Sequence, residues 1–168
     1  MLTVETRHAI DPAAAKGLDT AGLRSHFHAS GIFADGEIRL VYTHYDRLIL
    51  GGAVPGTGKL TLDQVKECGT ASILDRREMG ILNIGDSGTV SAGGTDYTVN
   101  KGDVLYLGMG SGPVTFSGPG KFYILSAPAH RSCASKLIRI EDARRVEMGS
   151  AETSNERVIL QFLHPEVA

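Results

Sequence analysis

Residues 89–99 read TVSAGGTDYTV, with short strand-like runs on both sides of Gly93-Gly94. Adjacent glycines can take the positive φ angles that a tight two-residue hairpin turn demands. This stretch gives the clearest local signal in the chain. It predicts a β-hairpin over residues 89–99 and a fold built from short strands.

The same organisation extends outward from this hairpin. Twenty-one glycines and no tryptophan are distributed as short spacers between apolar runs, which favours many strands joined by tight turns. Helical patterns are confined to Asp11–Gly17 and Thr61–Glu67. The sequence therefore predicts an all-β sandwich or barrel with short helical pieces near the N-terminus. The expected strands are Glu37–Thr43, Arg47–Val54, Met79–Gly85, Thr89–Ala92, Asp96–Val99, Asp103–Leu107, Lys121–Ser126 and Val158–Leu163.

Composition excludes several classes of partner. The 168 residues are 42% hydrophobic and 21% charged, with a net charge of −2 and no basic stripe for nucleic acid or a membrane surface. No stretch approaches the ~20 apolar residues of a membrane helix. We expect a cytoplasmic protein with a small-molecule partner, in which Cys68 and Cys133 are buried free thiols.

The composition changes after His130. Residues 131–156 are polar and charged apart from Leu137–Ile140, and an apolar strand then follows at residues 158–163. This profile is typical of a connection between sheets. We expect residues 1–130 to form one domain, and residues 131–168 to form a connection and the first strand toward a second, absent domain.

The glycine spacing is similar to that of the cupin family, whose jelly-roll barrels bind metal through His-x-His, a glutamate and a later histidine. In this register the ligand positions fall on Asp75-Arg76-Arg77, Ile81 and Pro113. Arginine, isoleucine and proline cannot supply the nitrogen or carboxylate ligands of a transition metal. The sequence therefore predicts a metal-free cupin-type jelly roll that keeps the glycines because they set turn geometry. The matching glycines are Gly69, Gly88, Gly102, Gly108 and Gly110.

Four motifs in order resemble the 5-dehydro-4-deoxy-D-glucuronate isomerase family over nearly the whole chain. They are Leu18–Arg24, Thr43–Gly52, Arg76–Gly85 and Ala127–His130. The resemblance implies a ketol-isomerase of pectin and uronate catabolism that forms 3-deoxy-D-glycero-2,5-hexodiulosonate. It also implies a second cupin domain whose ligands bind zinc beyond Ala168. The 168-residue chain alone is then expected to be inactive. The terminal strand Arg157–Leu163 is apolar on nearly both faces, so we expect it to pair but to leave apolar surface uncovered, which favours a homo-oligomer.

A sugar-acid substrate carries a carboxylate, which a guanidinium binds in planar bidentate geometry. Arg47, Arg76 and Arg77 are therefore predicted substrate contacts, together with His44 and His130, which fall inside the family-like motifs. The catalytic base is left unassigned.

Each of these predictions has a structural alternative. A histidine at a strand end can simply bond a neighbouring loop, and Arg76-Arg77-Glu78 can form surface salt bridges. His26-Phe27-His28 has the spacing of a metal pair, but we expect it on an exposed loop without metal. The alternative function is a non-catalytic cupin module that binds a sugar acid or serves oligomer assembly.

Overall fold

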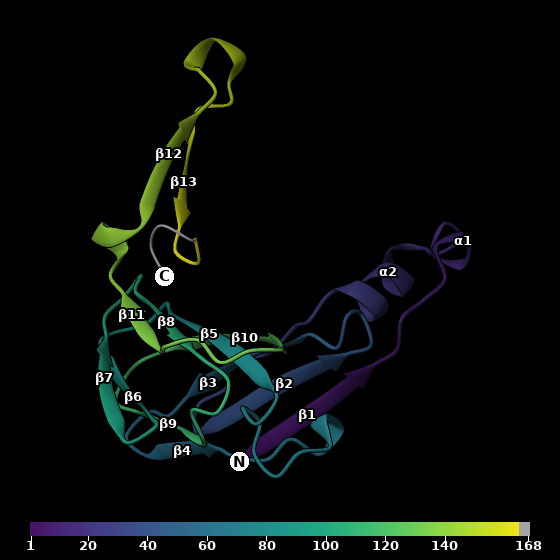
Figure 1. Ribbon diagram of the computed structural model, residues 1–168. Helices are drawn as coiled ribbons and strands as arrows, with labels where there is room; N and C mark the ends of the chain where they lie inside the picture. Colours follow the sequence, from purple (N-terminus) through teal and green to yellow (C-terminus); the bar gives the residue numbers. More distant parts are fainter. Residues whose placement is uncertain (165–168) are drawn as a thin grey trace.

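The computed structural model describes residues 1–164 and contains two packed β-sheets with a separate two-stranded ribbon (Figure 1). The larger sheet has seven strands, in the spatial order β1-β2-β3-β10-β5-β8-β11. Strand β1 pairs in parallel with β2, and the remaining pairs in this sheet are antiparallel. The bounds are β1 (Leu2–Arg7), β2 (Glu37–Thr43), β3 (Ile49–Val54), β10 (Phe122–Pro128), β5 (Arg77–Asn83), β8 (Val104–Leu107) and β11 (Lys136–Ile138).

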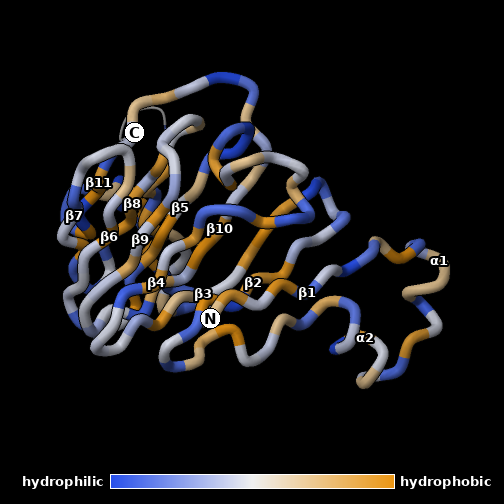
Figure 2. Tube along the Cα trace, turned by 90° about the horizontal axis from the view of Figure 1, so that it is seen from below, coloured by the Kyte–Doolittle hydropathy of each residue, from blue (hydrophilic) through white to orange (hydrophobic). Residues whose placement is uncertain are grey.

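The smaller sheet has four strands in the spatial order β4-β9-β6-β7. Their bounds are β4 (Lys59–Leu62), β9 (Val114–Ser117), β6 (Gly88–Ala92) and β7 (Thr95–Val99). The apolar side chains facing inward from the two sheets form the core, in which the rings of Phe116 and Phe122 lie 5.3 Å apart. Hydrophobic residues concentrate in the stacked strands, as Figure 2 shows. The expected all-β, cupin-type sandwich is confirmed.

Helical pieces are short. They are α1 (Pro12–Ala15) and α2 (Thr20–Phe27), with 3-10 turns at Lys66–Cys68, Ile140–Asp142 and Ala151–Thr153. Asp11 and Asp19 cap the two helices, because their carboxylates accept hydrogen bonds from backbone N–H groups of the first turn. No helix among the described residues is long and apolar enough to cross a bilayer.

The β12–β13 ribbon projects away from the two sheets (Figure 1). It pairs β12 (Arg144–Met148) with β13 (Arg157–Gln161) in antiparallel register. Val158, Ile159 and Leu160 keep 43%, 39% and 36% of their surface exposed. The prediction that this terminal strand pairs yet leaves apolar surface uncovered is confirmed.

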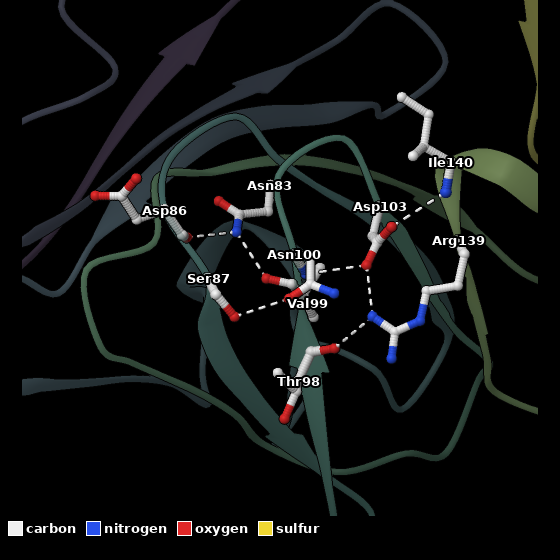
Figure 3. Close-up of polar contacts among 9 residues, drawn as sticks. All are labelled: Asn83, Asp86, Ser87, Thr98, Val99, Asn100, Asp103, Arg139 and Ile140. Carbon is white, nitrogen blue, oxygen red and sulfur yellow. Dashed lines mark hydrogen bonds and ion pairs between the residues drawn. The ribbon is translucent and has the colours of Figure 1, made fainter.

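A buried carboxylate ties the polypeptide after β11 to the sandwich (Figure 3). Asp103 is 1% exposed, and its Oδ2 accepts from Asn100 N at 3.0 Å and from Arg139 Nη1 at 2.6 Å. Its Oδ1 accepts from Ile140 N at 3.1 Å. This one side chain therefore joins the β7–β8 turn to the segment that leads into the ribbon.

Several local expectations were wrong. Thr61 and Leu62 belong to strand β4 rather than to a helix over Thr61–Glu67, and only Lys66–Cys68 forms a 3-10 turn. His26 and Phe27 lie in helix α2 and not on a loop. Strand β3 begins at Ile49, because Arg47 has a φ of 55° in the turn before it. The sheet also continues past residue 130, since β11 pairs with β8.

Candidate functional site

All the predicted site residues lie at one end of the seven-stranded sheet. The antiparallel register places the β2–β3 turn, which carries His44 and Arg47, beside the end of β10, because Ser126 pairs with Ile49. The same register places Pro128 opposite Arg77 at the start of β5. Topology therefore gathers motifs that are far apart in the sequence.

Arg77 occupies the interior of the sandwich. Strand β5 alternates between buried and partly exposed residues, so Arg77 shares its inward face with Met79 and Ile81. The Arg77 side chain is 5% exposed. Its Nε donates to Ser126 Oγ at 3.1 Å, and its Nη2 donates to Ser126 O at 2.8 Å and Arg47 O at 2.7 Å. These bonds fix the β2–β3 turn against β5 and β10.

The inward positions do not fit a metal centre. Burial lowers the pKa of Arg77, whose guanidinium still presents a cation where the cupin register puts a ligand. Ile81, at the glutamate position, is fully buried in the core. Within residues 1–164, no group of three or more His, Cys, Asp or Glu side chains is arranged to hold a metal ion. The retained glycines do serve geometry, since Gly69, Gly102 and Gly110 have φ values of 66°, 89° and 89°.

The remaining predicted residues are exposed at this end of the sheet. The His44 ring stacks on His8 with centroids 4.4 Å apart, and the Tyr42 ring lies nearly perpendicular to the His44 ring with centroids 5.5 Å apart. Arg47 and Arg76 are exposed, and the Arg76 carbonyl accepts from Ala129 N at 2.9 Å. His130 is also exposed, and it lines the groove described next.

A groove of about 770 Å³ runs over the outer face of the larger sheet, beside the segment that joins β10 to β11. The polar centre of the groove is the pair Glu78 and Tyr106, neither of which was predicted as a site residue. Tyr106 Oη donates to Glu78 Oε2 at 2.8 Å, across the β5–β8 register that pairs Gly80 with Tyr106. Burial first, and then the hydrogen bond to Glu78, raise the pKa of Tyr106, so its phenol stays protonated. The described lining residues are Glu78, Tyr106, Pro128–Lys136 without Ser132, Leu163 and His164.

The wall of this groove is held in place by hydrogen bonds. Ser132 Oγ donates to Met109 O at 2.8 Å, and Ser135 Oγ accepts from Gly108 N at 3.2 Å. A Cβ at Gly108 would lie 1.9 Å from Cys133 O, so only glycine permits this close approach. The glycine-rich turn therefore positions the wall.

Neither cysteine is part of a disulfide. Cys68 is half-buried, and burial raises the pKa of its thiol. Cys133 lines the groove and is exposed, so the expectation that both thiols are buried was wrong for this residue.

Comparison with known proteins identifies the family of this chain. The model of the KduI/IolB family matches residues 26–168. The chain belongs to the KduI/IolB family. A crystal structure of an IolB-like protein from Salmonella typhimurium LT2 has a TM-score of 0.54 at 14% identity, and the match covers 72% of this chain and 45% of that one. At 14% identity this structural similarity supports the fold alone.

Two curated relatives of this KduI/IolB chain carry the same name. The 4-deoxy-L-threo-5-hexosulose-uronate ketol-isomerase of Cereibacter sphaeroides (strain ATCC 17029) is 64% identical over 167 residues, which is 99% of this chain and 61% of the relative. The protein of that name from Agrobacterium fabrum is 62% identical, with the same coverage. The chain thus spans about three-fifths of the length of these relatives.

Proposed function

We propose that this chain forms the amino-terminal cupin portion of a ketol-isomerase that acts on 4-deoxy-L-threo-5-hexosulose-uronate in uronate catabolism. The observation that carries the proposal is the 64% identity to the Cereibacter relative over 99% of the chain. The zinc implied by the family resemblance would be bound outside residues 1–168, because Arg77 and Ile81 stand at the inward positions of this barrel.

Within that protein, the charged end of the seven-stranded sheet would face the substrate. Arg47, Arg76 and His44 are exposed there and remain predicted substrate contacts. Arg77 would contribute indirectly, because its bond to the Arg47 carbonyl holds the turn that carries Arg47 and His44.

A hybrid enzyme tests this proposal. Residues 1–168 would replace the matching segment of the Cereibacter relative, and turnover of the hexosulose-uronate would be followed in a coupled assay. At 64% identity we expect turnover within about tenfold of the intact relative, a change of about 1.4 kcal/mol in the barrier. The 168-residue chain alone should stay at background. A folded hybrid without turnover would instead favour a non-catalytic binding or assembly module.

We also propose that the ribbon mediates self-association. An isolated two-stranded ribbon is marginally stable in water, and β13 presents exposed Val158, Ile159 and Leu160. Sedimentation of the 168-residue chain across a wide concentration range should show a multimer, and Ile159→Glu should shift it toward monomer. A strictly monomeric chain whose β13 amides are protected from hydrogen exchange would contradict this.

A further inference from the structure

The groove between the outer sheet face and the β10–β11 segment has the dimensions of a ligand site. Small-molecule sites typically enclose about 300–1,000 Å³, and this groove has about 770 Å³. Its floor comes from the paired strands β5 and β8, and its wall is fixed by the serine contacts and by Gly108. The cavity is therefore preformed by hydrogen-bonded backbone.

The polar centre of the groove calls for hydroxyl groups on the ligand. An ionised carboxylate such as Glu78 can only accept hydrogen bonds. Tyr106 donates its single hydroxyl proton to Glu78, so the phenol oxygen can only accept further hydrogen bonds, and the Cys133 thiol lies within hydrogen-bonding reach of it. A ligand that satisfies both groups must bring donors, and a polyhydroxylated chain or ring does so.

The charges around the groove call for an anion. On the wall of the groove His130 and Arg131 are both exposed, so an imidazole and a guanidinium are presented beside the carboxylate of Glu78. A guanidinium or ammonium pairs with a carboxylate or a phosphate through charge-assisted hydrogen bonds. The ligand therefore combines hydroxyl groups with at least one acidic group.

We propose that this groove binds a six-carbon sugar acid, with its hydroxyl groups on Glu78 and Tyr106 and its carboxylate toward His130 and Arg131. The choice of a carboxylate over a phosphate rests on the proposed function. The proposal that the groove binds a ligand does not rest on the proposed function, because it follows from the side chains that line the groove.

Calorimetric titration of the 168-residue chain with D-glucuronate tests the site without any metal or turnover. Glu78→Gln keeps the shape but removes the charge, and should weaken binding about tenfold. Tyr106→Phe should weaken it about threefold or more. The matched control is Glu147→Gln, on the exposed ribbon, which should leave the affinity unchanged. Equal affinity for Glu78→Gln and the unaltered chain, or no binding of D-glucuronate, would overturn the proposal.

The ligand class is decided by comparing three probes. D-Glucuronate should bind more tightly than D-glucose, which lacks the acid, and more tightly than D-glucose 6-phosphate, which carries a different one. Tighter binding of the phosphate would overturn the carboxylate assignment. The titration uses neither zinc nor the hybrid enzyme. Binding of D-glucuronate together with an inactive hybrid would therefore contradict only the isomerase proposal, and an active hybrid without binding would contradict only this site.

A second measurement needs no variant and so does not depend on a variant's folding. Cys133 lines the groove and is exposed, whereas half-buried Cys68 lies outside it. D-Glucuronate should slow alkylation of Cys133 by iodoacetamide several-fold while the rate at Cys68 stays constant. Equal rates at Cys133 with and without the sugar acid would contradict occupancy of the groove.

Discussion

Asp103→Ala is expected to lower the free energy of unfolding by about 3 kcal/mol. Breaking a buried ion pair by removing one partner typically costs about 3–5 kcal/mol, because the other charge is left uncompensated. The Arg139 side chain is 35% exposed and can partly recover water, which places the effect at the low end of this range. The backbone N–H groups of Asn100 and Ile140 also lose their acceptor (Figure 3).

Urea unfolding of the two proteins measures this difference. Asp86→Ala is the matched control, since the Asp86 side chain is exposed and its backbone carbonyl, which accepts from Asn83, is retained. The control should change stability by less than about 0.5 kcal/mol. Asp103→Asn, which keeps an acceptor, should fall between the two. A loss below about 1 kcal/mol for Asp103→Ala would contradict the role assigned to this carboxylate.

The fold was predictable where local chemistry and tertiary pairing agree. Gly93 and Gly94 have φ values of 58° and 76°, and the strands on each side pair with Ala92 opposite Thr95, as the sequence indicates. Strands β4 and β9 were missed, because each has four residues and depends on pairing with strands distant in the sequence, β4 with β9 and β9 also with β6. Helix α2 was missed because its sequence, TAGLRSHF, includes Gly22 and has little apolar periodicity, although Asp19 gives a capping signal.

The candidate site was predictable only in part. Arg77 was expected to contact substrate, but period-two alternation places it on the same inward face as Met79 and Ile81, a signal that was available. His130 does line the groove. Tyr106 could not be assigned from sequence, because its bond to Glu78 spans 28 positions and depends on the β5–β8 register.

The absence of stoichiometric zinc from residues 1–168 is the second prediction with a large expected effect. The inward face of β5 presents the Arg77 cation, bonded to Ser126 and Arg47, and the apolar Ile81. A transition metal requires several imidazole, thiolate or carboxylate ligands in one place. His26, in helix α2, and His28, at its C-terminal cap, offer the nearest sequence pattern to a metal pair.

Metal analysis of the purified 168-residue chain, beside the intact Cereibacter relative, tests most directly whether residues 1–168 bind a metal ion. The chain should carry no more zinc than a His26→Ala/His28→Ala double variant. One zinc per chain that is lost in the double variant would place a metal site in this polypeptide and contradict the account.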